Sequence, residues 1–145
     1  MSLDMDVLAI SSDDIIDDFH FKGENLLGEV EPEDLAANGI DIYHTFEEDD
    51  YPVFAWMLSR ASERGMKDLK LLADDFMRLS LEDIKALRLS ILMNGTVGTT
   101  MKLAKGFDWR AYVRNGKIKD VGFCDCTEKF LEKNEDKALY VFFSW

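Results

Sequence analysis

Residues 138–145 read Ala-Leu-Tyr-Val-Phe-Phe-Ser-Trp, and this stretch decides the fold class. Aromatic and β-branched residues are frequent in it, and both favour β-strands. Apolar side chains occupy successive positions, so both faces of such a strand avoid water. A strand of this kind belongs inside a sheet or at an interface, because a solvated edge would expose it to aggregation. We therefore expect a sheet in which residues 138–145 form an inner or interface strand.

The residues before this strand predict its neighbours in the sheet. Residues 107–114 and 117–123 flank Asn115-Gly116, and Asn-Gly is a strong hairpin signal because both positions of a type I′ turn need positive φ. Residues 99–104 form an earlier candidate strand, and residues 127–134 a short helix that returns the chain to its last strand. The predicted sheet is therefore mainly antiparallel.

The middle of the chain predicts three consecutive helices. The first covers residues 51–64, with a capping-box spacing between Thr45 and Glu48 before it. The second covers residues 66–79, where five apolar side chains recur at helical spacing. The third follows Ser80, which is a capping residue with an acid three positions later, and ends at Asn94-Gly95.

These elements together predict an α+β fold. A three-helix cluster, residues 51–93, is expected to pack on a small, mainly antiparallel sheet formed by residues 99–145. A chain of 145 residues has the length of one domain. We expect a single domain 1–145, in which an acidic segment 1–50 docks on a helical part 51–95 and a mainly β part 96–145.

Negative charge is concentrated in the first fifty residues. They contain 16 acids and one base, Lys22, whereas residues 51–145 contain 13 acids and 16 bases, so net charges of −15 and +3 make up the total of −12. Such a field attracts basic partners and repels nucleic acid and anionic membranes. The acidic start and the absence of a long apolar run predict a cytoplasmic protein without a membrane span.

The acidic segment contains elements that argue against a solvated tail. Residues 12–19 predict a short helix with a serine cap, and residues 32–38 a second one with proline near its start and Gly39 beyond its end. Large apolar residues lie between and after them. We expect the segment to dock on the rest of the chain or on a partner.

Two motifs in this segment have alternative interpretations. Asp13-Asp14-Ile15-Ile16-Asp17-Asp18 resembles the diphosphate-binding motif of prenyl-transferring enzymes, which implies carboxylates that hold Mg²⁺. Those enzymes are all-helical and far longer, and no second acidic motif follows here at the required distance. Residues 7–14 resemble the motif that pairs with a ubiquitin-like modifier by strand addition. A solvated or partner-facing acidic helix is the simpler interpretation of the first motif, and the second is short and frequent by chance.

No pattern predicts a metal, a cofactor or a catalytic nucleophile. His20 and His44 lie beside acids that would raise their pKa, without the spacing of a known ligand set. Cys124 and Cys126 would share one face of a strand, but two cysteines do not complete a zinc site. The loop 94–100 lacks a phosphate-binding motif, and the field of the protein opposes a helix-turn-helix assignment for the two helices joined at Ser80.

We therefore expect a non-catalytic protein that neutralises a basic, nucleic-acid-binding or nuclease-like protein surface. It would act as an inhibitor, an immunity protein or a phage-type anti-defence protein whose carboxylates imitate phosphate spacing. Three aromatic residues of the first predicted helix would anchor the contact. The candidate contact residues are Asp13, Asp14, Asp17, Asp18, Glu31, Glu33, Asp34, Glu47, Glu48, Asp49, Asp50, Tyr51, Phe54 and Trp56.

Two alternatives remain open at this point. In the first, the C-terminal strand builds a homodimer and the acidic segment packs on the chain's own basic sheet, residues Lys102, Lys105, Arg110, Arg114, Lys117 and Lys119. In the second, the protein is a small enzyme or ligand-binding domain, which would require a concave pocket with converging polar groups. The position of the acids in the folded chain discriminates between the binding protein and the homodimer.

Overall fold

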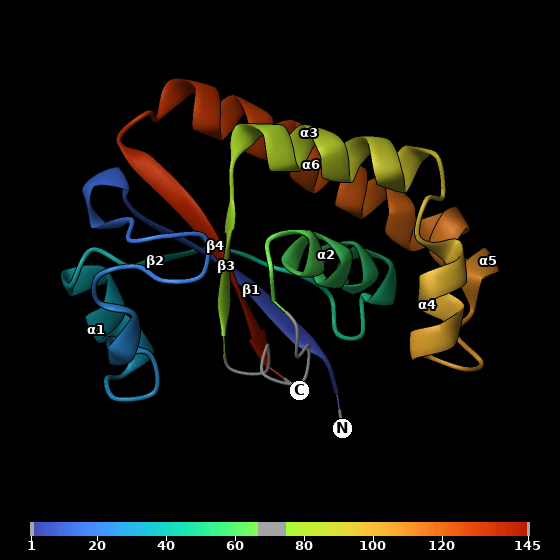
Figure 1. Cartoon of the computed structure of the whole chain (residues 1–145), viewed down its shortest axis with the longest axis horizontal. Helices are drawn as coiled ribbons and strands as arrows, with labels where there is room; N and C mark the ends of the chain where they lie inside the picture. Colours follow the sequence, from blue (N-terminus) through green and yellow to red (C-terminus); the bar gives the residue numbers. More distant parts are fainter. Residues whose placement is uncertain (1, 67–74, 145) are drawn as a thin grey trace.

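The computed structural model describes residues 2–66 and 75–144 (Figure 1). In these residues four strands form one antiparallel sheet in the order β2-β1-β4-β3. The strands are β1 (Asp4–Ser11), β2 (Asp41–Thr45), β3 (Phe76–Leu79) and β4 (Lys137–Ser144). Helices make up much of the remaining chain, so the predicted α+β class is confirmed.

The prediction of an inner C-terminal strand is confirmed. β4 pairs with β1 along eight positions, from Asp4↔Ser144 to Ser11↔Lys137, and with β3 along four. Both edges of β4 are therefore paired within the chain, so β4 has no free edge with which to pair with a second copy, as the predicted homodimer would require. The neighbouring strands were placed wrongly, because β1 and β2 come from the acidic first third rather than from residues 99–123.

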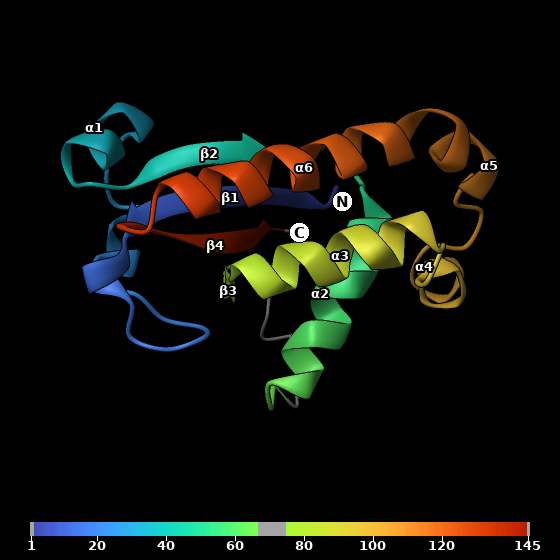
Figure 2. The same ribbon diagram turned by 90° about the horizontal axis from the view of Figure 1, so that it is seen from above.

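One face of the sheet carries the larger core. Alternate residues of the two central strands point to this face, and they are Met5, Val7 and Ala9 of β1 and Leu139, Val141 and Phe143 of β4. They pack against α2 (Tyr51–Glu63), α3 (Leu81–Leu92) and α6 (Lys117–Lys133). Figures 1 and 2 show these three helices on the same side of the sheet.

The opposite face is covered by residues 12–41, called here the acidic lobe. It consists of two short 3₁₀ turns, η1 (Ser12–Asp14) and η2 (Glu24–Leu26), the helix α1 (Pro32–Ala37) and connecting loops. Phe21 inserts between Tyr140 and Phe76, with ring centroids 4.8 and 5.0 Å away. The Tyr140 hydroxyl donates to the carbonyl oxygens of Asp17 at 2.6 Å and His20 at 3.0 Å. These contacts hold the lobe on the sheet.

Two helix starts follow their local sequence. Ser80 and Asp83 form a reciprocal capping box at the start of α3, as predicted. α2 begins where predicted, but its cap is Asp50, whose carboxyl oxygen Oδ1 accepts the Val53 N–H at 3.3 Å, rather than the pair Thr45 and Glu48. α1 lies within the predicted range 32–38, and Gly39 after it has φ of 78°.

The predicted helix 66–79 is wrong at its end. Residues 76–79 form β3, whose buried side chains alternate between the two faces of the sheet. Tertiary pairing with β4 therefore overrides the helical spacing of the apolar residues. The remainder of this prediction, residues 67–74, lies outside the described residues.

The predicted strands and hairpin within residues 99–123 are also wrong. This part of the chain forms α4 (Val97–Leu103), α5 (Trp109–Ala111), the π-helical turn η4 (Tyr112–Gly116) and the start of α6. Gly116 has φ of −76° and is not in a hairpin turn. A Cβ there would lie 2.8 Å from the Tyr112 ring, so glycine permits close packing of this ring. The assignment of residues 96–145 as mainly β is corrected accordingly.

The predicted helix 12–19 is reduced to the single turn η1. Ser11 caps it by accepting the Asp13 N–H at 3.3 Å. The chain then leaves the helical conformation, and Ile15 forms a β-bridge with Phe21. The acids of the Asp-Asp-x-x-Asp-Asp motif therefore do not share a helical face. Residues 7–10 lie inside the sheet between β2 and β4, which removes them from strand addition to a partner.

Candidate functional site

Most carboxylates of the acidic lobe point into solvent. Those on exposed residues are Asp13, Asp17, Asp18, Glu29, Glu31, Glu33, Asp34 and Asp41, whereas Asp14 and Glu24 are half-buried. Glu24 accepts from His20 Nδ1 at 3.0 Å, and Asp18 lies 4.0 Å from Arg64 Nε. Within residues 2–66 and 75–144, the other eight form no ion pair. The lobe, with ten acids and Lys22, has a net charge of −9.

The exposed carboxylates stand on an ordered frame of hydrogen bonds. Asp17 accepts the Phe19 N–H at 2.8 Å, and the carbonyl of Asp14 accepts the Lys22 N–H at 2.7 Å. The Arg78 N–H of β3 donates to the Asp18 carbonyl at 2.7 Å, which ties the loop to the edge of the sheet. The loop that carries Asp14, Asp17 and Asp18 is therefore held in one conformation, which lowers the entropy lost when it meets a partner.

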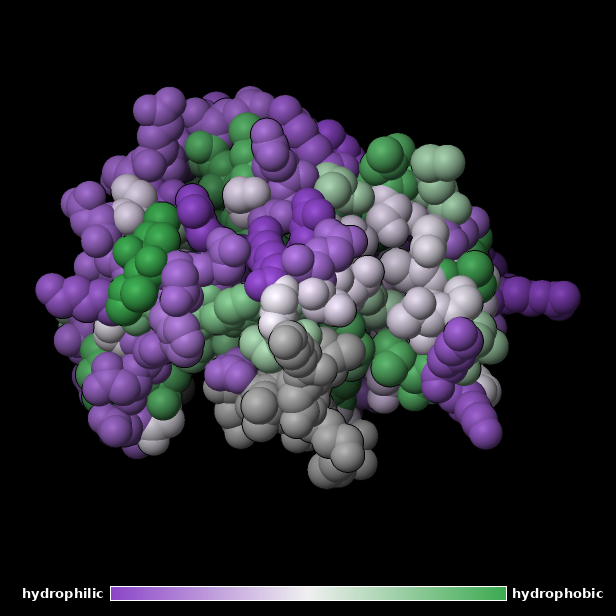
Figure 3. All heavy atoms as spheres, in the orientation of Figure 1, coloured by the Kyte–Doolittle hydropathy of each residue, from purple (hydrophilic) through white to green (hydrophobic). Residues whose placement is uncertain are grey.

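An apolar groove lies beside these charges. It has a volume of about 530 Å³ between the lobe and the uncovered part of the sheet face. Asp6 and Glu24 supply the carboxylates at its wall. Its apolar lining consists of Leu8, Leu27, Val30, Leu35, Ile42, Phe76 and Phe142. Figure 3 shows hydrophobic spheres among the hydrophilic ones that dominate the left-hand end of the molecule, where the lobe lies. A ligand for this site must combine positive charge with apolar side chains.

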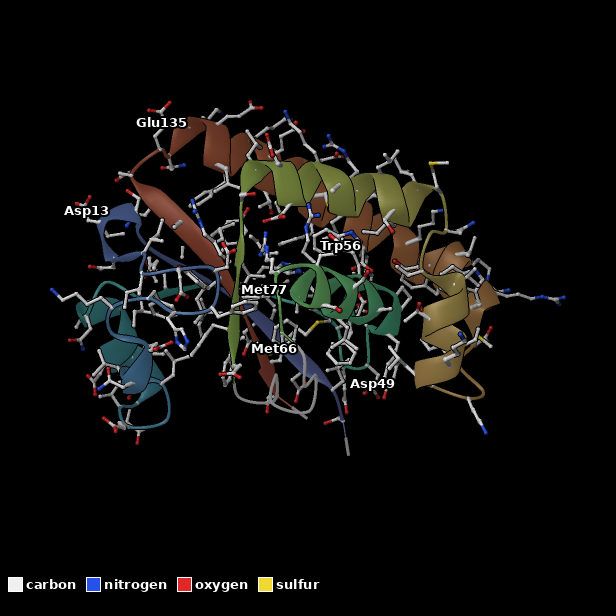
Figure 4. The ribbon with its side chains drawn as sticks, in the orientation of Figure 1. Asp13, Asp49, Trp56, Met66, Met77 and Glu135 are labelled. Atoms are coloured by element: carbon white, nitrogen blue, oxygen red, sulfur yellow. The ribbon has the colours of Figure 1, made fainter. Side chains whose placement is uncertain are left out.

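The second group of candidate acids, Glu47–Asp50, lies elsewhere. Asp13 and Asp49 are well separated in Figure 4, on the left of the molecule and below α2. The four residues line a cavity of about 330 Å³ together with Phe107, Asp108, Ala111, Tyr112, Asn115, Gly116, Lys119 and Asp120. The acids predicted as one surface are therefore divided between two sites.

Two buried carboxyl groups form the floor of this cavity. Asp50 is 9% exposed and Asp120 is 5% exposed, and their side chains are hydrogen-bonded to each other. Burial, together with the neighbouring Asp120, raises the pKa of Asp50 to about 9. Burial also raises the pKa of Asp120, although hydrogen bonds from Asp50 and Tyr112 oppose the shift. One proton is therefore held between the two groups at neutral pH.

The protein itself satisfies both groups. The Tyr112 hydroxyl donates to Asp120 at 2.8 Å, and burial raises the pKa of this tyrosine. Asp50 accepts the Val53 N–H at the start of α2. The pair thus joins α2, η4 and α6. The pair Asp50 and Asp120 combines a proton donor with a proton acceptor, but its hydrogen bonds link elements of the fold.

The remaining residues of this group also have local roles. Glu47 is paired with Lys119, and Asp49 accepts the Leu3 N–H at 2.8 Å. Asp49 has a positive φ of 60°. Glu48 is exposed and has no ion pair in the described part of the chain. Three of the four candidate contacts are therefore already engaged within the fold.

Two of the three residues predicted as aromatic anchors, Phe54 and Trp56, are buried and cannot contact a partner. Phe54 is 7% exposed and Trp56 is 9% exposed, because α2 runs through the larger core (Figure 4). The Arg60 guanidinium lies 5.4 Å from the centre of the Trp56 ring and covers it. Tyr51 is half-buried, with its ring 6.0 Å from that of Phe107. The apolar contribution to a contact must come from the groove instead.

The histidines and cysteines are separated by the fold. Hydrogen bonding to Glu24 raises the pKa of His20, as expected, whereas burial between aromatic rings lowers the pKa of His44, contrary to the prediction. Cys124 is buried and Cys126 exposed, because both lie on a helix and not on a strand. In the described residues, no three His, Cys, Asp or Glu side chains converge as a metal site.

No protein-family model matches the chain, and no curated protein or solved structure is significantly similar to it. Among residues 2–66 and 75–144, no helix has the length and apolar character needed to cross a membrane. The functional assignment therefore depends on the geometry of the acidic lobe and its groove.

Proposed function

We propose that this protein is a non-catalytic binding protein whose acidic lobe neutralises a basic surface of another protein. The observation that carries the proposal is the apolar groove of about 530 Å³ beside seven exposed carboxylates that form no ion pair in the described residues. A nucleic-acid-binding or nuclease-like protein offers the matching surface, because its phosphate contacts are lysine and arginine side chains. The protein would then act as an inhibitor that occupies such a surface.

Charge and groove make different contributions to this binding. Opposite charges accelerate encounter and align the partners, but each exposed ion pair contributes only about 0.2–1 kcal/mol. Burial of one leucine or methionine side chain in the groove contributes about 1.5–3 kcal/mol. Apolar burial therefore contributes more of the affinity than the exposed ion pairs, and the cost of association is subtracted from both.

An enzymatic function has less support, although the buried pair Asp50 and Asp120 borders a cavity. Perturbed carboxyls in a cavity are a common feature of active sites. Here, however, each group has a protein partner that accounts for its position, as described above. The exposed and unpaired carboxylates of the lobe have no such account within the described chain.

Two labelled peptides of equal charge test the proposal. One alternates lysine and leucine, and the other alternates lysine and serine. Fluorescence anisotropy at low salt is expected to show tighter binding of the lysine–leucine peptide, because only its leucines enter the groove. The variant Ile42→Ser changes an exposed groove residue and should weaken this peptide but not the lysine–serine peptide.

A charge variant tests the role of the carboxylates. Glu29→Gln, Glu31→Gln and Glu33→Gln together remove three exposed charges from the lobe. Loss of three ion pairs is expected to weaken peptide binding about tenfold, which corresponds to about 1.4 kcal/mol. The matched control removes Glu48, Glu63 and Glu82, which are exposed outside the lobe. Equal binding of the two variants would show that the lobe is not the binding site, and equal binding of the two peptides would show that the groove does not take part.

A further inference from the structure

A second surface lies at the other end of the molecule and has the opposite charge. Residues 92–119, called here the basic end, contain six bases and one acid, Asp108, for a net charge of +5. They comprise the end of α3, α4, α5, η4 and the start of α6. Figures 1 and 2 both show α4 and α5 at the end of the molecule opposite α1. The bases of this segment therefore lie far from the acidic lobe, although Glu47–Asp50 of the acidic first third border the basic end at the cavity.

The basic end also presents most of the exposed apolar side chains. Of the ten large apolar residues found exposed in the described chain, seven lie in this segment. They are Leu92, Met93, Val97, Met101, Leu103, Val113 and Ile118, with exposed fractions from 40% to 75%. Figure 3 shows hydrophobic spheres over the end of α3 and over α4. Such a concentration is typical of an interaction surface rather than of scattered surface residues.

Hydrogen bonds hold these elements in one arrangement. Lys117 Nζ donates to the carbonyl of Leu92 at 3.1 Å and to Asn94 Oδ1 at 2.9 Å, which joins the start of α6 to the end of α3. Thr96 Oγ1 donates to the carbonyl of Pro52 at 3.1 Å and fixes α4 on α2. In the part of the chain that the structure describes, the exposed bases Lys102, Lys105, Arg110 and Arg114 form no ion pair.

We propose that the basic end of one copy docks on the acidic lobe of a second copy, with its apolar side chains in the groove. The two surfaces are complementary in charge and in the arrangement of their apolar groups. One combines a charge of +5 with protruding apolar side chains, and the other combines −9 with an apolar groove of about 530 Å³. Because they lie at opposite ends of the molecule, they meet only between copies.

This partner is favoured over a polyanion such as nucleic acid or an anionic membrane. The whole chain has a net charge of −12, so a polyanion that approaches the basic end meets the repulsion of the rest of the protein. A second copy presents its most acidic surface to the basic end and its own basic end away from it. The contact joins two different surfaces, so it generates chains or rings rather than a two-fold dimer.

The head-to-tail contact uses the same acidic lobe as the proposed function and rests on that lobe being a binding surface. It adds a regulatory consequence. A lobe occupied by a second copy is not free for a basic partner, so self-association and partner binding compete. Dilution or a strongly basic partner would release the lobe.

Sedimentation velocity of the full chain at about 50 mM salt tests the contact. The weight-average mass is expected to rise with protein concentration to at least twice that of one chain and to return to that of one chain at about 500 mM salt, where charges are strongly screened. The basic-end variant combines Lys102→Glu and Lys105→Glu. The lobe variant combines Glu31→Lys and Ile42→Lys. All four residues are exposed, so both variants are expected to fold, which circular dichroism checks.

Mixing the two variants separates this contact from other modes of association. Each variant alone retains one intact surface and should remain monomeric, whereas an equimolar mixture should form a one-to-one dimer. The control variant, Lys129→Glu with Lys133→Glu, changes the charge of α6 outside the basic end and should associate like the original protein. A mixture that stays monomeric, or single variants that still associate, would overturn the assignment.

The peptide assay distinguishes the two proposals. If the original protein is monomeric at all concentrations but its lobe binds the lysine–leucine peptide, the head-to-tail contact is wrong and the proposed function stands. If the protein neither associates nor binds the peptide, both are wrong. Binding of the original protein to anionic lipid vesicles that is lost in the basic-end variant would assign this end to a membrane and overturn the second-copy assignment.

Discussion

Replacement of Asp50 with asparagine is expected to stabilise the protein at neutral and mildly alkaline pH. Asp50 caps α2 through the Val53 N–H and is hydrogen-bonded to Asp120 in a buried position. Asparagine caps helices as well as aspartate does. Its amide group also donates a hydrogen bond, which the Asp120 carboxylate accepts. The substitution therefore keeps both contacts and removes the ionisable group.

The magnitude follows from the pKa of Asp50, which burial raises from 3.8 to about 9. Between these values the folded protein binds a proton that the unfolded chain releases. The free energy of unfolding contributed by this group is therefore complete below about pH 4 and falls as the pH rises towards 9. Each pH unit corresponds to about 1.4 kcal/mol, and pH 7 lies about three units above the ordinary pKa. Asp50→Asn should gain at most about 4 kcal/mol at pH 7 and almost nothing near pH 4.

Urea denaturation followed by tryptophan fluorescence measures this effect at several pH values between 4.5 and 8.5. The difference between variant and original protein reports the buried pair Asp50 and Asp120, because the titrating groups outside the pair are common to both. Glu48→Gln removes one charge from an exposed neighbour and controls for the change in net charge. A difference that does not grow with pH, or a variant that is less stable at pH 8, would refute the description of the buried pair.

Three further substitutions or reactions test the packing. Asp83→Ala should lower the free energy of unfolding by about 3 kcal/mol at pH 7, because it leaves Arg60 and Arg64 without their buried partner. Burial alone would raise the pKa of Asp83, but hydrogen bonds from Ser80 and Arg64 outweigh burial and lower it. The loss should therefore shrink as the pH falls below 4, where this carboxyl group takes up a proton. Phe21→Ala should cost about 3–5 kcal/mol and accelerate amide exchange in residues 12–41 more than in α3. A thiol reagent should label exposed Cys126 rapidly and Cys124 only on unfolding, because Cys124 is fully buried and burial raises the pKa of its thiol to about 12.

The elements that the sequence predicts correctly have strong local signals. The apolar run at 138–145 excludes a solvated environment for either face, which leaves an inner or an interface strand, and pairing with β1 and β3 makes β4 an inner one. The capping box at Ser80 satisfies its own backbone groups and needs no distant partner. Proline at the start of α1 and glycine after it act in the same local way. These features determine where a helix or strand begins and ends, but they do not determine which helices and strands pack together.

The incorrect elements depend on contacts that the sequence does not encode locally. Asn115-Gly116 has the preferred composition of a tight turn, but Gly116 is selected here by the ring of Tyr112 packed against its Cα. The partner of Tyr112 is Asp120, a charged residue at a helical position where an apolar one would have indicated α6. Residues 4–11 alternate two acids with apolar residues and form the central strand β1, but the strong negative charge of the segment favours a surface position over a central strand.

The candidate site was predicted in part for the same reason. Exposure of most acids in residues 13–34 follows from their charge and needs no tertiary information. The roles of Asp50, Phe54 and Trp56 depend on the burial of α2, which only the packing of the sheet determines. The groove combines residues from β1, β2, β3, β4 and the lobe, so no single stretch of sequence contains its signal.

The separation of charge between the two ends should make the stability of the monomer depend on salt concentration. Ten carboxylates in thirty residues repel one another, and in the described chain only two of them have basic partners. The six bases of residues 92–119 belong to elements at the end of the molecule opposite α1 (Figures 1 and 2). Repulsion within the lobe therefore destabilises the isolated fold, and either screening or a cationic partner relieves it. Added sodium chloride should raise the unfolding midpoint of the dilute monomer while it weakens self-association and peptide binding. If salt instead lowers the midpoint of the monomer, the lobe is neutralised within the chain and carries no excess charge for a partner.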